Sequence, residues 1–283
     1  IFIVIFFIPY TASGFAACGK LFSTLFGVSY VPAMIVSAIV IVAYTALGGF
    51  SAASTTDLIQ SIVMSFALIC VVLFGVKTAG GTDVILSQAG ELPGYLSMTQ
   101  TYMNGEATEY GAIKIASMLA WGLGYFGMPH ILLRFMAIED EKKIKISRRI
   151  ATVWVVISMS VAIFIGIVGN NLSRNGALQV LEGSDSEKLI ITLGTLMSKS
   201  GFLGILVAGL IMSGILACTM STADSQLLAA SSSISEDLLK KVFHLEIKEK
   251  TSLLAARATV LVISILGVFM AMDPESSVFG IVS

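Results

Sequence analysis

Two adjacent hydroxyl side chains in an apolar segment are the first candidates for chemistry. Ser221 and Thr222 follow Cys218 by three and four residues, so in a helix the Cys218 carbonyl lies beside both hydroxyls. Three uncharged oxygens grouped in this way suit a small hard cation such as Na⁺, if a second helix supplies further oxygens. The alternative is structural, because a hydroxyl in an apolar helix often bonds back to the preceding turn or serves close helix packing.

Two carboxylates lie in or beside apolar segments, where an ionised group is costly and is therefore a functional candidate. Asp224 follows the hydroxyl pair. We expect it either to line a route for sodium or to meet water where the helix bends. Asp57 begins another apolar segment, after the run Ser54-Thr55-Thr56. It either caps the free amides of a first helical turn or receives the cation as it leaves inward.

Aromatic residues at helical spacing are candidates for a solute pocket. Trp121 and Tyr125 are four residues apart, in a stretch up to Pro129 that holds three glycines. Glycine and proline weaken a helix, and irregular backbone is tolerated at membrane depth where it lines a cavity. The pair therefore either walls a small-solute pocket or belongs to an interfacial aromatic belt. Tyr10, which precedes Thr11-Ala12-Ser13-Gly14, either joins such a pocket or serves helix packing.

The composition indicates that these residues work inside a lipid bilayer. Hydrophobic residues make up 56% of the chain, charged residues 12%, and the mean hydropathy is +0.92, which exclude an ordinary soluble domain. A net charge of −1 gives no general attraction to nucleic acid. The three cysteines lack metal-ligand or redox spacing, and no catalytic set is present, so an enzyme is not expected.

Apolar segments long enough to cross the bilayer predict one all-α polytopic membrane domain over residues 1–283. The chain begins without an initiator Met and stops inside an apolar run, so we expect a fragment truncated at both ends. The expected spans are 1–17, 31–50, 57–76, 115–136, 151–169, 203–223, 253–272 and the start of a further one at 278–283.

Basic residues predict the orientation of these spans. Lys and Arg crowd the connections near residues 142–149 and 240–250, whereas the connections near 77–110 and 170–200 are poor in them. Because cytoplasmic loops carry the excess of Lys and Arg, we expect the first pair of connections to face the cytoplasm.

The motifs, taken in order, resemble those of the solute:sodium symporter family over essentially the whole chain. Within that family the chain is most similar to the bacterial members that carry proline. The matching stretches are Tyr10 to Gly14, Ala43 to Ala52, Thr56 to Gln60, Trp121 to Met136, Met220 to Thr222 and Ser235 to Leu238.

The resemblance implies an inverted-repeat helical bundle of the leucine-transporter type, working by alternating access. It places sodium at the Cys218 carbonyl and the Ser221 and Thr222 hydroxyls, with the remaining ligands on helices before Ile1. It associates Asp57 with the sodium route, and an acid at Asp224 is familiar elsewhere in the family. Tyr10, Trp121 and Tyr125 match aromatic positions of the solute pocket.

The function that the resemblance implies is sodium-driven uptake of a small amino acid, with L-proline as the first candidate. Na⁺ would be the coupling ion, no organic cofactor is expected, and the protein would lie in a bacterial inner membrane in contact with lipid. Met128 and Cys218 depart from Gln and Ala in the proline-carrying members; Cys218 would act through its backbone, whereas Met128 bears on the choice of solute. The alternatives are symport of a carboxylate or sugar, and a membrane sensor module of a signalling protein.

Overall fold

The computed structural model describes residues 2–103, 105–245 and 248–282, so the expected span limits at Ile1 and Ser283 lie outside the described residues. The chain divides into two compact units. Unit 1 comprises Ile1–Ala67 and Leu181–Ser283, and unit 2 comprises Leu68–Val180.

Unit 1 is built from helices that come from both ends of the chain. They are α1 (Phe2–Phe26), the first part of α2 (Tyr30–Ala79), the 3-10 helix η2 (Gly183–Lys188), α7 (Leu189–Ser198), α8 (Phe202–Ser232), the π-helical segment η3 (Ser233–Val242), α9 (Glu249–Met270) and α10 (Val278–Val282). The expected span 203–223 is therefore the first part of a longer helix.

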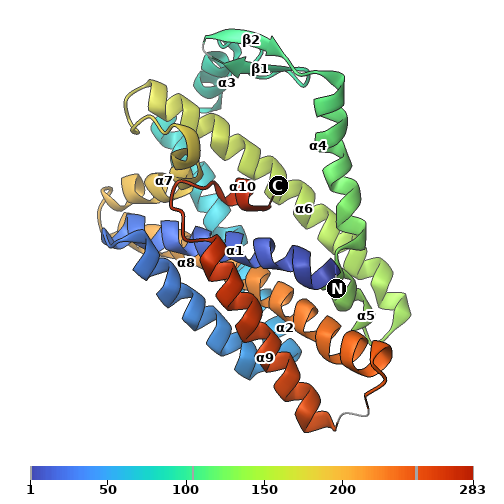
Figure 1. Cartoon of the computed structure of the whole chain (residues 1–283). Coiled ribbons are helices and arrows are strands. Elements are labelled where there is room, and N and C mark those ends of the chain that lie inside the picture. Colours follow the sequence, from blue (N-terminus) through green and yellow to red (C-terminus); the bar gives the residue numbers. More distant parts are fainter. Residues whose placement is uncertain (1, 104, 246–247, 283) are drawn as a thin grey trace. The chain divides into compact units, whose positions relative to one another are not determined.

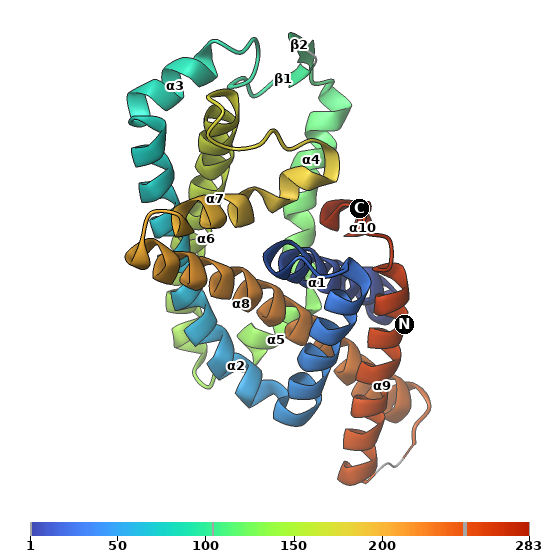
Figure 2. The same ribbon diagram turned by 90° about the vertical axis from the view of Figure 1, so that its left-hand side faces the viewer.

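The core of unit 1 lies where α1, α8 and α9 pack against one another (Figures 1 and 2). Small residues permit this approach. A Cβ atom at Gly14 of α1 would lie 3.4 Å from the Ala223 Cβ atom of α8. One at Gly267 of α9 would lie 3.4 Å from the Phe15 ring. Because apolar side chains gain little from leaving lipid, such close backbone contact is a principal source of helix association in membranes.

Helix α2 contains a sharp break at Gly49, whose φ of +63° and ψ of −166° are far from helical values. Glycine tolerates this positive φ because it lacks a Cβ atom. The break separates two stretches that are each long and apolar enough to span a membrane, Tyr30–Ser51 and Ala53–Ala79. The helix resumes at once after the break, so no open loop separates the two stretches.

Unit 2 contains the rest of α2 and the segments that follow it. These are α3 (Thr82–Gly90), the strands β1 (Gln100–Met103) and β2 (Glu106–Glu109), α4 (Ala112–Gly124), the 3-10 turn η1 (Tyr125–Gly127), α5 (Pro129–Met136) and α6 (Glu141–Arg174). The strands form an antiparallel hairpin in which Thr101 pairs with Thr108. The sequence analysis did not predict this hairpin, which leads directly into α4 (Figure 1).

The glycine-rich stretch after Trp121 interrupts its helix, as the sequence predicts. Helix α4 ends at Gly124, a 3-10 turn follows, and Met128 is extended with φ −65° and ψ 118°. Pro129 then occupies the first turn of α5, where its missing amide hydrogen is not needed. The interruption lies within a candidate span, Ala112–Met136.

Seven helices within the described residues are long and apolar enough to cross a membrane. The prediction of an all-α polytopic membrane protein is confirmed.

Candidate cation and solute site

The predicted cation ligands lie together on one turn of α8. The Thr222 hydroxyl donates a hydrogen bond of 3.0 Å to the Cys218 carbonyl, so these two oxygens are adjacent. The Ser221 hydroxyl forms no hydrogen bond within the described part of the chain. Thr222 is exposed and Ser221 half-buried in unit 1. Thr222 thus makes the hydrogen bond to the preceding turn that a purely structural role predicts. The Ser221 oxygen, by contrast, is available to accept a cation.

The donor set fits part of a sodium site. Its three oxygens are neutral, which suits reversible binding of a monovalent cation. They are too few for a dehydrated hard cation, which takes about six oxygen ligands. Within the described residues, no cluster of three or more His, Cys, Asp or Glu side chains offers an alternative metal site.

Asp224 is completely buried in the core of unit 1. Its carboxylate accepts a hydrogen bond from the Tyr44 hydroxyl and one of 3.1 Å from Ser225. Full burial excludes, for this conformation, the expectation that Asp224 meets water at a helix bend; α8 continues for eight residues beyond it. The carboxylate is held by protein donors instead, which is how a buried charge becomes tolerable.

Tyr44 is a neighbour of the candidate site that the sequence analysis missed. From α2, its hydroxyl contacts Asp224 and lies 3.3 Å from the Met220 carbonyl, immediately before Ser221. It therefore ties the last turns of α2 before the Gly49 break to the turn of α8 that carries Ser221 and Thr222. The sequence could have indicated Tyr44, because its hydroxyl lies within an apolar span and needs a hydrogen-bond partner. The sequence could not identify that partner.

Asp57 lies inside the second stretch of α2, eight residues after the break at Gly49. Only 8% of it is exposed. The expected position at the first turn of a new helix is therefore wrong, because the helix already resumes before Ser54. Asp57 is close enough to Tyr44 to act on its hydroxyl electrostatically. This places Asp57 in the surroundings of Tyr44.

Arg257 of α9 stabilises the broken end of the first stretch of α2. Its Nε atom donates a hydrogen bond of 3.1 Å to the Ala46 carbonyl, three residues before Gly49. A helix that ends leaves its last carbonyls without amide partners. A cationic side chain at such a carboxyl end satisfies a carbonyl and opposes the negative end of the helix dipole.

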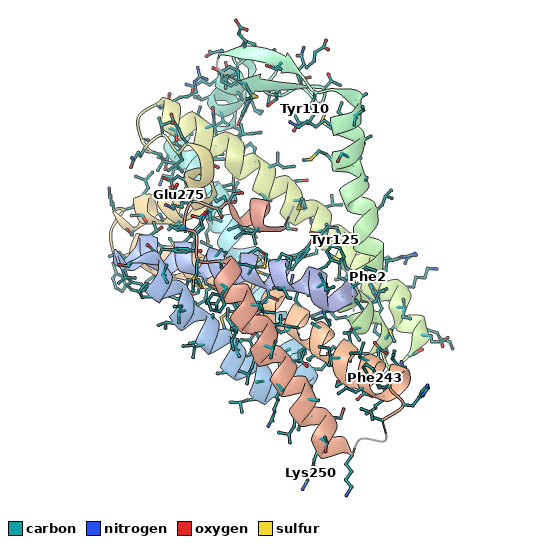
Figure 3. The ribbon with its side chains drawn as sticks, in the orientation of Figure 1. Phe2, Tyr110, Tyr125, Phe243, Lys250 and Glu275 are labelled. Atoms are coloured by element: carbon teal, nitrogen blue, oxygen red, sulfur yellow. The ribbon has the colours of Figure 1, made fainter. Side chains whose placement is uncertain are left out.

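The three predicted aromatic residues are divided between the two units. Tyr10 is half-buried on α1, where its ring lies 6.3 Å from that of Phe7 and its carbonyl accepts a hydrogen bond from Ser13. Tyr125 is exposed at the junction of α4 and η1 in unit 2 (Figure 3). The side chain of Trp121 lies outside the described residues. The solute-pocket and aromatic-belt interpretations of Trp121 and Tyr125 therefore both stand.

A buried ion pair joins α1 to η2, and the same lysine also contacts the connection between α9 and α10. The Lys20 ammonium is 6% exposed and donates to Glu187 at 2.7 Å and to the Ser276 carbonyl at 2.9 Å. The same Glu187 oxygen accepts from the Val278 amide at 3.0 Å. Lys20 was also missed by the sequence analysis.

The family model described as "Sodium:solute symporter family" matches residues 1–283. The osmoregulated proline transporter of Bacillus subtilis is 34% identical over 280 residues, which are 99% of this chain and 54% of that protein. The sodium/proline symporter of Salmonella typhimurium is 35% identical over 282 residues, again 99% of this chain and 54% of that protein. The chain thus spans about half the length of the curated relatives it matches.

A solved structure of a Na⁺-coupled sialic acid symporter resembles the fold, with a TM-score of 0.75 over 95% of this chain and 56% of that one. The sequences are 18% identical, so this likeness concerns the fold alone. It agrees with the predicted leucine-transporter-type bundle. The candidate spans and the bacterial relatives identify a multi-pass protein of the bacterial inner membrane.

Proposed function

Because the chain belongs to the sodium:solute symporter family, we propose that the complete protein couples sodium entry to the uptake of a small amino acid, with L-proline first. The observation that carries this proposal is the identity of 34–35%, over 99% of the chain, with proteins named as proline transporters. The members of the family are transporters rather than enzymes.

Sodium would bind at the Cys218 carbonyl and the Ser221 and Thr222 hydroxyls. The free Ser221 oxygen and the neutral donor set support this assignment. The two acidic residues Asp57 and Asp224 would line the route of the ion, and Asp224 lies only two residues beyond Thr222. Oxygens from elsewhere in the complete protein would fill the remaining coordination positions.

The solute would lie against aromatic faces. A pyrrolidine ring is apolar, and concave sites for small ligands are lined largely by apolar and aromatic side chains. Tyr10, Trp121 and Tyr125 are the residues proposed for this wall. Sodium binding would favour the solute-accepting conformation, and this coupling free energy acts equally in both directions.

The test is L-proline uptake into proteoliposomes that contain the complete protein, with an inward sodium gradient. The double variant Ser221→Ala, Thr222→Ala should lose sodium-dependent uptake, or need at least about tenfold more sodium, which corresponds to about 1.4 kcal/mol. Ser213→Ala is the matched control, because its hydroxyl lies on the same helix and bonds back to the Gly209 carbonyl at 2.9 Å. Unaltered sodium dependence of the double variant would refute the assignment of the cation site.

A panel of competing solutes tests the choice of cargo. The Na⁺-coupled structural neighbour carries sialic acid, so the panel includes that sugar acid together with proline, other amino acids and simple carboxylates. We expect unlabelled L-proline to compete most strongly with labelled L-proline. Stronger competition by a sugar or a simple carboxylate would reassign the solute while leaving the sodium coupling in place.

A further inference from the structure

Two polar side chains in the core of unit 1 have no hydrogen-bond partner among the residues that the structure describes. Thr11 of α1 is 0% exposed and Gln226 of α8 is 1% exposed. Within the described residues, the Thr11 hydroxyl and both the oxygen and the nitrogen of the Gln226 amide are unsatisfied. Buried polar groups are nearly always hydrogen-bonded, so each exception calls for an explanation.

The register of the α1–α8 crossing follows from contacts of Gly14 and Cys18 of α1 with Thr219 and Ala223 of α8. A Cβ atom at Gly14 would lie 3.4 Å from the Ala223 Cβ atom and 3.8 Å from the Thr219 side chain. The Cys18 thiol, one turn further along α1, interacts with the same Thr219 side chain. Residue numbers therefore rise along α1 as they fall along α8, and the two ribbons run in opposite directions (Figures 1 and 2).

This register places the two unsatisfied side chains at the same level. Thr11 lies one turn before Gly14, and Gln226 lies one turn after Ala223. Residues three or four apart share a face of a helix, so both side chains continue the faces that meet at the crossing. Although they are at the same level, Thr11 and Gln226 are not hydrogen-bonded to each other.

The three unsatisfied groups form a neutral set of donors and acceptors. An amide offers two N–H donors and a carbonyl acceptor, and a hydroxyl can donate and accept. A carboxylate needs donors, whereas an ammonium or imino group needs an acceptor. An amino acid carries both and has no net charge, so neutral protein groups can satisfy it without burying a net charge. A sodium ion would find only two oxygens here, because the amide nitrogen cannot coordinate it.

Both residues adjoin positions already proposed for transport. Thr11 follows Tyr10 directly, and Gln226 lies one turn beyond Thr222 on α8. Within unit 1, a head group at this level would thus lie between Tyr10 and the proposed cation ligands. This placement lets the occupancy of one site alter the affinity of the other.

We propose that Thr11 and Gln226 bind the polar head group of an amino-acid solute, with the Gln226 amide nitrogen and the Thr11 hydroxyl donating to its carboxylate. The Gln226 amide oxygen accepts from its ammonium or imino group. The inference rests on the proposed function and deepens it, because it assigns the recognition of the charged ends of the solute to residues outside the aromatic wall.

The test uses Gln226→Leu and Thr11→Val in the complete protein, since both changes keep the approximate volume and remove polar atoms. L-Proline uptake and the proline-induced shift in melting temperature report solute binding. The melting shift caused by Na⁺ alone, against K⁺, reports the cation site. We expect the proline KM to rise at least tenfold in Gln226→Leu and several-fold in Thr11→Val, with the Na⁺ response within twofold of wild type.

The melting temperature without solute separates binding from a structural role. It should stay equal or rise in both variants, because an unsatisfied buried polar group is removed. Ser264→Ala is the control for truncation, since its buried hydroxyl is satisfied by the Val260 carbonyl at 2.7 Å. This control should melt lower and keep the wild-type proline KM.

Two outcomes overturn the inference. One is an unchanged proline KM in Gln226→Leu, which would assign its amide to the protein interior. The other is an equal loss of the Na⁺ response, which would assign the residue to the cation site. Wild-type protein that takes up no amino acid in a sodium gradient would refute the proposed function itself, a result that the wild-type arm reports before any variant is compared.

Discussion

Two of the buried polar side chains of α1, Lys20 and Thr11, differ in how they are satisfied. Lys20 is charged, and its ammonium contacts the Glu187 carboxylate and the Ser276 carbonyl. Thr11 lies nine residues earlier, roughly 13 Å along the helix, and is neutral. It faces the crossing at which the Gln226 amide also lacks a partner among the described residues.

Because Lys20 and Thr11 are both buried but only Lys20 is paired among the described residues, burial of a polar group does not by itself identify a binding site. A buried charge must be paired, because its desolvation would otherwise exceed any gain from folding. Neutral hydrogen-bonding groups cost about 1–3 kcal/mol each when unsatisfied, which a folded protein can bear. The Lys20 cluster therefore holds segments of unit 1 together, whereas Thr11 and Gln226 retain unused capacity to bind a ligand.

The largest effect is expected from breaking the Lys20 pair. Lys20→Met removes the ammonium that pairs with the Glu187 carboxylate, and removal of one member of a buried pair typically costs about 3–5 kcal/mol. We expect about 3 kcal/mol, since Glu187 is 25% exposed. The measurement is the midpoint of thermal unfolding in detergent. If Lys20→Met melts like wild type, the assignment of a fold-holding role to this cluster is wrong.

The exposed pair Lys188–Asp185, at 2.6 Å, is the control for Lys20. The hydrogen bond from the Lys188 ammonium, together with the positive charge of that group, holds the pKa of the Asp185 carboxyl below its usual value. Asp185 thus stabilises the fold above its unfolded pKa, and this contribution is lost as the pH falls through the lower folded pKa. Because water screens exposed pairs, Lys188→Met should shift the melting midpoint far less than Lys20→Met, and this small difference should vanish in acid.

An intermediate effect is expected at Arg257, whose guanidinium group donates a hydrogen bond to the Ala46 carbonyl. Arg257→Gln weakens the bond to Ala46 at the end of the first stretch of α2, at a cost of about 1–2 kcal/mol. Since this end also carries Tyr44, we expect a lower maximal uptake rate with a smaller change in the proline KM. Arg257→Lys should restore part of the rate, because it keeps the charge. A KM effect as large as that of Gln226→Leu would instead place Arg257 at the solute.

The smallest effect on folding is expected at Thr11. Thr11→Val removes a hydroxyl that has no partner in the described part of the chain, so the free energy of unfolding should change by less than about 0.5 kcal/mol or rise slightly. Ser37→Ala provides the contrast, because its buried hydroxyl is satisfied by the Ala33 carbonyl at 2.8 Å and its loss should lower stability. Chemical denaturation of the paired variants measures the difference. A clear loss of stability in Thr11→Val would show that its hydroxyl is satisfied after all.

The sequence by itself determined the features that depend on neighbours within one or two helical turns. The apolar runs predicted an all-α membrane protein, since the thickness of the bilayer fixes the length of a spanning helix. The glycines before Pro129 predicted the interruption between α4 and α5. The contact between Cys218 and Thr222 could be predicted from the sequence, because residues four apart are neighbours on any α-helix.

Only the tertiary structure decided which distant groups meet. Tyr44 and Asp224 are 180 residues apart, Lys20 and Glu187 are 167 apart, and Arg257 and Ala46 are 211 apart. The structure also corrected the expected position of Asp57 in its helix, because α2 resumes directly after Gly49 and does not begin at Asp57. Helical periodicity tells which residues share a face, but the close packing of α1, α8 and α9 selects the face that each one meets. That selection left Thr11 and Gln226 buried and unsatisfied while it paired Lys20.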